Sequence, residues 1–366
     1  MIKTFVFIIL LIHAFIHILG FIKAFFKDKL KELKLQISKT FGIIWLISSI
    51  LLFIYAIIFI SDHQHSWVIG FIAIIVSQIL IFRFWKDSKY GSFINLLILL
   101  LIFYSYSTYE FNKLTNYETS IILSKIPSTV IKNTYSENIK NLPAPVQKWI
   151  VKTGVVGKPQ IYVGIIKQKA LIKLKPDQKN WYKATAIQYT TIDTPAFIWT
   201  VNMKMLPGVY FNGRDKFQNG KGEMLIKVNN IFNVVKETGE KLDEGAAIRY
   251  LAELIWFPSL ALNSFISWKE IDSLTAEATF TYKGKMVSGM FYFNENGDFV
   301  KFESLRYKDN TPNSKRYPWI VRAYDYAIFD EIRVPSKLQV IWKLDKNYWT
   351  WLNIEITDIK YNSLSD

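Results

Sequence analysis

Cysteine is absent from the 366-residue chain. Its absence excludes disulfides, thiolate nucleophiles, thiolate metal sites and cysteine-bound iron–sulfur clusters. It also excludes lipoprotein anchoring through an N-terminal cysteine. Because cysteine-free domains occur on both sides of a membrane, this absence does not assign a compartment.

Histidine is scarce, and all four histidines lie within the first 65 residues. The rest of the chain therefore has no Ser-His-Asp triad, no Cys-His pair and no histidine-rich zinc site. Catalysis there would need paired carboxylates or a lysine-activated serine. No motif holds two of the candidate acids at a working distance, and we therefore expect a binding protein more than an enzyme. The candidate acids are Asp215, Glu223 and Glu253.

Charged residues are nearly absent from four apolar runs near the N-terminus, at about 4–22, 42–61, 67–85 and 91–109. Each run approaches the length that crosses a bilayer. Lysines and arginines occupy the first and third connections, whereas the second, 61–66, has none. The positive-inside rule then places both basic connections in the cytoplasm. The sequence predicts a multi-pass protein of the inner (cytoplasmic) membrane, with both termini and everything after residue 110 extracytoplasmic.

The first basic connection has two interpretations that we rate equally. Its apolar and basic residues both recur at helical spacing, which is typical of a helix lying in the headgroup plane. A cytoplasmic extension of the first transmembrane helix would give the same pattern. The apolar positions are Ile22, Phe26, Leu30, Leu33 and Ile37, and the basic ones are Lys23, Lys27, Lys31 and Lys34.

His13 and His17 are four residues apart and share one face of the first predicted helix. Ionisable side chains inside a membrane are candidates for function, so this pair could ligate a metal or a haem, or relay a proton. The alternative, which we favour, is hydrogen bonding between helices by neutral imidazoles. No other cofactor is expected.

The net charge of +15 does not indicate nucleic-acid binding. The basic residues are scattered along strand-like segments, whereas a nucleic-acid surface shows a concentrated patch or a reader motif. Attraction to anionic membrane lipid is the better interpretation.

Beyond the membrane part, we expect a stalk at 111–141 and a β-rich domain at 142–366. Two series of alternating segments, within 161–236 and 276–361, predict short strands joined by local turns. Helical segments between strands are missing, which argues against a parallel α/β fold. The predicted fold is an α-helical membrane bundle of four transmembrane helices (1–110) plus an antiparallel β-rich extracytoplasmic domain, a curved sheet or half-barrel with a covering helix.

The covering helix is predicted at 243–257, between the two series of strands. Asp243 is a plausible N-cap, and Pro258 ends the helix at or near the preceding residue. Arg249, Glu253 and Trp256 lie at i, i+4 and i+7 and form a stripe beside the apolar face. Such a helix suits a lid or plug on the sheet.

Five residues are candidates for ligand binding: Arg214, Arg249, Glu253, Trp256 and Arg306. An arginine beneath the helix could clamp an anionic headgroup bidentately. A salt-bridge network that seats the helix on the sheet is the alternative, and we favour it. Large aromatics on one strand face would form core or line an apolar concavity. Those aromatics are Trp199, Tyr210, Phe291 and Trp342.

The string Arg249-Tyr250-Leu251-Ala252-Glu253-x-x-Trp256-Phe257-Pro258 resembles the signature of an uncharacterised bacterial membrane-anchored family, a domain of unknown function. Leu142-Pro143-x-Pro145-Val146-Gln147 and Gly213-Arg214-Asp215 add to the resemblance, which covers about 140–361. The N-terminal His13-x-x-x-His17-x-x-Gly20-Phe21-x-Lys23-Ala24 also looks like the membrane-anchored members. The resemblance implies no activity. In architecture alone, the outer domain is distantly similar to periplasmic lipoprotein carriers.

The leading hypothesis is a membrane-anchored, extracytoplasmic, non-enzymatic module that binds a lipid or other apolar ligand. Expected partners are membrane lipid and an apolar small molecule or lipoprotein. The rival hypotheses are a membrane redox or metal protein that uses His13 and His17, and a scaffold that docks a partner protein on the outer sheet.

Overall fold

The computed structural model describes residues 2–26, 30, 34–124, 133–134, 136–345 and 347–364. The chain divides into two compact units, one of residues 1–113 with 229–231, the other of 114–228 with 232–366. Each unit is described by itself.

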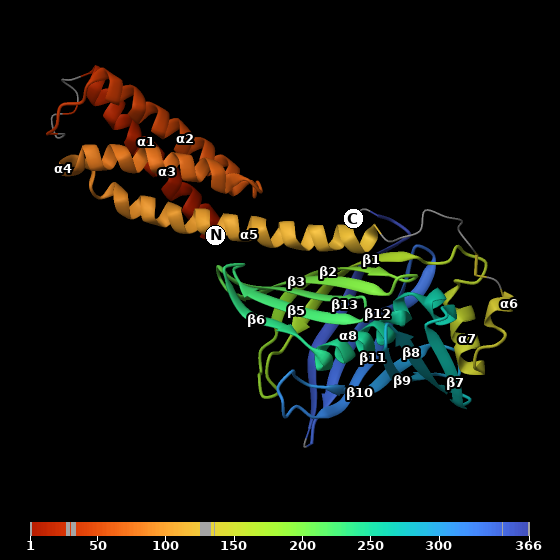
Figure 1. The fold of residues 1–366 in the computed structure, drawn as a ribbon. Helices are drawn as coiled ribbons and strands as arrows, with labels where there is room; N and C mark the ends of the chain where they lie inside the picture. The colour runs from red at the N-terminus through yellow and green to blue at the C-terminus, as the bar shows by residue number, and fades with distance from the viewer. Residues whose placement is uncertain are drawn as a thin grey trace. The chain divides into compact units, whose positions relative to one another are not determined.

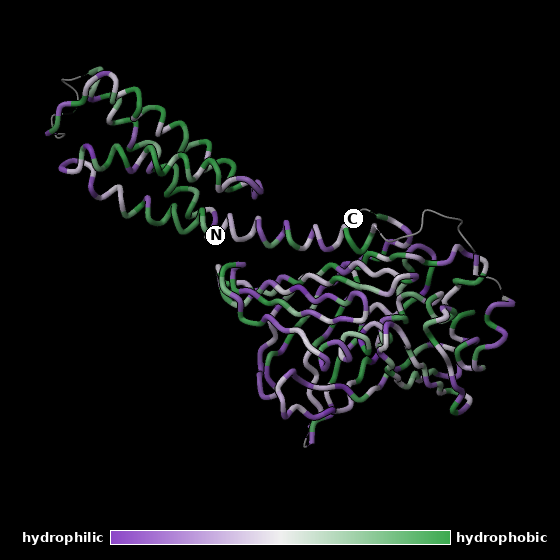
Figure 2. Tube along the Cα trace, in the orientation of Figure 1, coloured by the Kyte–Doolittle hydropathy of each residue, from purple (hydrophilic) through white to green (hydrophobic). Residues whose placement is uncertain are grey.

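The first unit is helical. Its helices are α1 (Ile2–Phe25), α2 (Lys39–Ile60), α3 (Ser66–Arg83), the single turn α4 (Trp85–Ser88) and α5 (Gly91–Leu123), which continues into the second unit. Four of them are long and apolar enough to cross a membrane: Lys3–Phe25, Lys39–Ile60, Ser66–Arg83 and Gly91–Leu123. Figure 2 shows these helices as largely hydrophobic, whereas the strands of the second unit alternate in hydropathy. Four long apolar helices are thus confirmed.

The first basic connection is described only in part. α1 ends at Phe25, and residues 34–38 are not helical. Lys27, Lys31 and Leu33 of the predicted amphipathic segment lie outside the described residues.

The second unit is built on one antiparallel sheet of 13 strands. Two short helices, α6 (Ser136–Ile139) and α7 (Ala144–Thr153), precede the sheet. The strands are β1 (Val163–Ile172), β2 (Tyr182–Thr191), β3 (Ala196–Leu206), β4 (Val209–Gln218), β5 (Lys221–Val228), β6 (Phe232–Thr238), β7 (Ile266–Asp272), β8 (Thr275–Tyr282), β9 (Lys285–Phe293), β10 (Phe299–Tyr307), β11 (Arg316–Phe329), β12 (Ile332–Lys343) and β13 (Tyr348–Tyr361). The expected antiparallel β domain is confirmed as an open sheet.

The strand order follows from two meanders. β1 to β6 pair in sequence, as do β7 to β13, and the meanders join where β1 pairs with β13, from Gly164 with Tyr361 to Ile172 with Leu352. The open edges of the sheet are therefore β6 and β7. These are also the strands between which the chain runs through α8 (Glu240–Ala252), so α8 connects one edge of the sheet to the other.

α8 lies within the curve of the sheet (Figure 1), and strands from both meanders contact it. The backbone N–H of Gly222 in β5 donates to the Asp243 carboxylate at 2.8 Å. On the other meander, Arg316 of β11 pairs with Glu244 at 2.7 Å. The apolar face of α8, including Ala247 and Leu251, is fully buried in the core. Since one helix contacts both halves, the sheet must curl around it.

Glycines allow the helical segment to approach the strands closely. A Cβ on Gly222 of β5 would lie 2.6 Å from the carbonyl oxygen of Leu242 in α8. A Cβ on Gly164 of β1 would lie 2.2 Å from the ring of Phe257, which follows the helix and is fully buried. Both strands therefore need glycine at these positions.

Three details of the expected fold are wrong. α8 begins at Glu240 after Gly239, so Asp243 is not the N-cap; its carboxylate is occupied by Gly222 and two lysines. The segment expected to continue as helix to Phe257 is a 3₁₀ turn, Glu253–Trp256, followed by another, Pro258–Leu262. β7 was not expected, because it is a mostly exposed edge strand without a clear alternating pattern.

Candidate functional site

A cavity of about 610 Å³ lies between the concave face of the sheet and α8. Its wall is mostly apolar and comes from strands of both meanders, which the curl of the sheet brings to face one another. Six tryptophans contribute to the wall: Trp199, Trp256, Trp319, Trp342, Trp349 and Trp351. Concave, largely apolar spaces of this size are the usual hosts of small ligands.

A partly buried polar cluster centred on Arg249 borders the cavity. The Arg249 guanidinium donates to Glu253 at 2.7 Å, to Asp215 at 3.0 Å and to the side-chain oxygen of Gln188 at 2.7 Å. Gln188 in turn donates to Glu253 at 2.6 Å. The guanidinium also lies 4.6 Å from the ring centroid of Phe197. Each nitrogen of the Arg249 guanidinium therefore donates one hydrogen bond, and the bonds to Gln188 and Asp215 hold α8 against β2 and β4.

Arg306, on β10, borders the same cavity without such partners. Its guanidinium lies 4.8 Å from the ring centroid of Trp319. On its other side is α8 at Gly245, where a Cβ would lie 2.9 Å from the Arg306 Nε. No described residue gives Arg306 a hydrogen bond or an ion pair. A guanidinium is thus held in the cavity wall with its donor groups unused.

Burial changes the ionisation of this region. It raises the pKa of Asp215, although Arg249, Arg306 and Arg214 oppose the shift. Burial, together with the charge of Arg249, lowers the pKa of Arg306 to about 10, while Asp215 and Glu253 act in the opposite direction. Arg306 therefore remains charged at neutral pH, whereas Asp215 binds a proton more readily than an exposed aspartate does.

Of the five predicted ligand-binding residues, Arg249, Glu253, Trp256 and Arg306 line the cavity. Trp256 is also fixed by a hydrogen bond from its indole N–H to the Pro335 carbonyl oxygen at 3.0 Å.

The structure does not bring Arg214 to the cavity. Adjacent residues of a strand point to opposite faces of the sheet, so Asp215 faces α8 and Arg214 faces away. Arg214 pairs with Glu118 of α5 at 3.0 Å and with Glu223 at 3.2 Å. Lys216 also contacts Glu118, at 2.8 Å. These pairs attach the end of α5 to the outer side of the sheet.

Several cavity residues were not expected from the sequence. Trp349 and Trp351 lie two residues apart on β13, a spacing that could have indicated a shared face. The indole nitrogens of Trp319, Trp349 and Trp351 are buried without a hydrogen-bond partner among the described residues. Of the aromatics that were expected, Trp199 and Trp342 line the cavity, and Phe291 is in the core.

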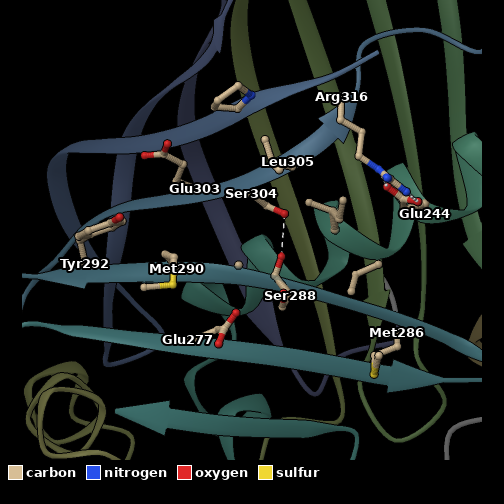
Figure 3. Close-up of a pocket in the computed structure, with 14 residues that line it drawn as sticks. Glu244, Glu277, Met286, Ser288, Met290, Tyr292, Glu303, Ser304, Leu305 and Arg316 are labelled. Carbon is tan, nitrogen blue, oxygen red and sulfur yellow. Dashed lines mark hydrogen bonds and ion pairs between the residues drawn. The ribbon is translucent and has the colours of Figure 1, made fainter. Parts of the chain in front are cut away.

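A second hollow, of about 480 Å³, opens where β9 and β10 separate. The ladder between these strands ends at Glu303 and Met290. Beyond it, the Ser304 hydroxyl donates to the Ser288 carbonyl oxygen at 2.7 Å. Figure 3 shows this contact and, at one side of the hollow, Arg316 beside Glu244 of α8. Its wall mixes carboxylates with apolar side chains, so it is a weaker candidate for an apolar ligand.

His13 and His17 lie together in the helical unit, with ring centroids 4.6 Å apart. Nε2 of His13 is 3.0 Å from the Asn95 side-chain oxygen, and Nε2 of His17 is 2.8 Å from the Ser77 hydroxyl. Nδ1 of His17 is 3.0 Å from the His13 carbonyl oxygen. A metal at this pair would have to displace these contacts. Within the described residues, no group of three or more histidines and acids is placed to hold a metal ion. Metal or haem ligation by this pair remains a prediction.

Comparison with solved structures finds weak likenesses. A LolA superfamily protein from Nitrosomonas europaea is similar over 60% of this chain and 95% of its own, with 10% identity and a TM-score of 0.35. A beta-barrel-like protein of the domain of unknown function DUF1849 from Brucella abortus is similar over 56% of this chain and 99% of its own, with 8% identity and a TM-score of 0.18. No curated protein matches the chain.

A family of unknown function, DUF6544, matches residues 132–354. This range contains α8 and every residue that lines the cavity. The expected relationship to a family of unknown function is confirmed. The role of residues 249–258 as the signature of that family remains a prediction. Because the match covers more than half of its length, the chain belongs to the family of unknown function DUF6544.

Proposed function

We propose that this protein is a membrane-anchored binding module that holds a lipid or other apolar molecule in the cavity beneath α8. The observation that carries the proposal is the cavity itself, about 610 Å³ of mostly apolar wall inside a domain of one sheet and one crossing helix. Filling such a space removes apolar surface from water and stabilises the complex.

The four apolar helices serve as the anchor in this proposal. The basic first and third connections lie in the cytoplasm of a bacterial cell, and the sheet domain lies on the outer side of the inner membrane. In this arrangement the cavity samples molecules that leave the membrane. The domain holds its ligand without chemistry, and the polar cluster around Arg249 keeps α8 in place.

Lipid analysis of protein purified without detergent tests this function. We expect the full chain, extracted in a membrane-solubilising polymer, to carry one apolar molecule in excess over the surrounding bilayer lipid. Ile354→Trp places a large ring in the cavity wall and should remove that molecule. The matched control is Ile328→Trp, at a position that is 69% exposed and outside the cavity.

The comparison with the control separates a cavity ligand from annular lipid. Equal lipid content in the wild type, Ile354→Trp and Ile328→Trp would show that the copurified lipid surrounds the helices and that the cavity binds none.

A further inference from the structure

We propose that the cavity ligand is an acidic amphiphile, an apolar chain with one carboxylate or phosphate, and that Arg306 binds its anionic group. This inference rests on the proposed function and adds the chemical class of the ligand. It starts from the contrast between the two arginines of the cavity wall.

Arg249 and Arg306 differ in what their guanidinium groups contact. Arg249 hydrogen bonds with three side chains. Arg306 has a ring on one side and helix backbone on the other, and no described residue accepts a hydrogen bond from it. Arg306 is half-buried and lines the cavity, so donors that no described residue accepts face the cavity space. A missing acceptor beside a cavity therefore indicates a ligand that supplies one.

The position of Arg306 is built into the fold. The Trp319 ring, which is 4% exposed, covers one side of the guanidinium. Because Gly245 has no side chain, the Arg306 guanidinium has room beside α8. A guanidinium that is already oriented loses little freedom on binding, and its planar fork matches a carboxylate or a phosphate.

The nearby acids do not serve as partners of Arg306. Glu253 and Asp215 both accept hydrogen bonds from Arg249, at 2.7 and 3.0 Å. Arg306 therefore has no hydrogen-bonded acid among the described residues, and the anionic group of a ligand in the cavity would supply one.

Photocrosslinking with three probes of equal chain length tests the proposal on the full chain in polymer. The probes are diazirine-bearing hexadecanoic acid, the corresponding lysophosphatidic acid and hexadecanol, and the readout is crosslink yield on peptides of the cavity strands. We expect at least one acidic probe to label these strands about tenfold more than the alcohol does. Preferential labelling by the fatty acid would indicate a free fatty acid as the ligand, and preferential labelling by the lysophosphatidic acid would indicate a phospholipid source.

Two variants locate the anion subsite. Arg306→Met should reduce labelling by the acidic probe to the level of the alcohol and leave the alcohol unchanged. Gly245→Ala should also reduce labelling by the acidic probe, because the new Cβ displaces the Arg306 guanidinium. Alanine is favourable in a helix, so α8 itself should be preserved.

The outcomes separate the two proposals. Equal labelling by acids and alcohol in the wild type, or a preference for acids that survives Arg306→Met, overturns the anion subsite and leaves apolar binding intact. If none of the three probes labels the cavity strands, both the proposed function and this inference fail.

Discussion

At the scale of single residues, two arginines in one cavity wall have different roles. Arg249 hydrogen bonds with Gln188, Asp215 and Glu253, whereas no described residue accepts a hydrogen bond from Arg306, which lies beside the Trp319 ring and Gly245 of α8. An arginine whose donors are satisfied stabilises the fold, while an arginine with unused donors is available to a ligand. Stability measurements can tell the two roles apart.

Arg249→Met should destabilise the second unit by about 3–5 kcal/mol, because two partly buried carboxylates lose their partner. Arg306→Met should cost about 1 kcal/mol or less, since no hydrogen bond is broken. Denaturant unfolding of the ligand-free full chain, followed by tryptophan fluorescence, measures both. A similar cost for the two variants would contradict the distinction.

Asp243 gives a prediction for pH. Burial would raise its pKa, but hydrogen bonds from the Gly222 N–H and from Lys221 outweigh burial, and the pKa of Asp243 is lowered from 3.8. A lowered pKa contributes stability that is present above pH 3.8 and is lost as the pH falls through the folded-state value.

The change Asp243→Asn removes this titration and keeps an acceptor for Gly222. The wild type should therefore be more stable than Asp243→Asn at pH 6, and the difference should shrink toward pH 3. Thermal unfolding of both proteins across this range is the measurement. A difference that is constant with pH would show that the Asp243 charge does not contribute.

At the scale of elements, α8 depends on the strands that allow it to approach. Gly222→Ala should cost about 1–3 kcal/mol, because the new methyl group meets the helix backbone at Leu242. Gly213→Ala is the comparison, since its methyl group meets a side-chain carbon of Val201 at 2.8 Å, and that side chain can move. Unfolding free energies should rank Gly222→Ala as the more costly change, and the reverse order would contradict the close packing of α8 on β5.

The elements were largely predictable from sequence, but their assembly was not. Alternation and turn residues indicate most strands, and the 3.6-residue period indicates the helix that precedes Pro258. The pairing of β1 with β13 joins segments almost 200 residues apart, and no local pattern specifies it. Because the curl of the sheet follows from that pairing and from α8, the cavity could not be predicted either.

Only part of the candidate site could be predicted, because local sequence patterns do not specify which distant segments meet. Arg249 and Glu253 lie on one helix, so their contact follows from spacing. Alternation implies that Arg214 and Asp215 face opposite sides, but it does not say which side faces α8. The unpaired state of Arg306 depends on neighbours from α8 and β11, which only the folded chain brings together.

At the scale of the whole molecule, the absence of cysteine makes the orientation testable. We expect single cysteines at Gln64 and Ile328 to react with a membrane-impermeant maleimide in spheroplasts. A cysteine at Lys89 should react only after permeabilisation, because the proposed topology places the basic third connection in the cytoplasm. Labelling of Lys89→Cys in intact spheroplasts together with protection of Ile328→Cys would reverse the proposed topology.

We propose that a ligand occupies the space between α8 and the sheet. An experimental density map of the full chain, purified in polymer without detergent, can show whether it does. We expect elongated density along the tryptophan-rich wall, with one end at Arg306. A map in which α8 packs directly on the sheet, with side chains filling the cavity, would contradict it.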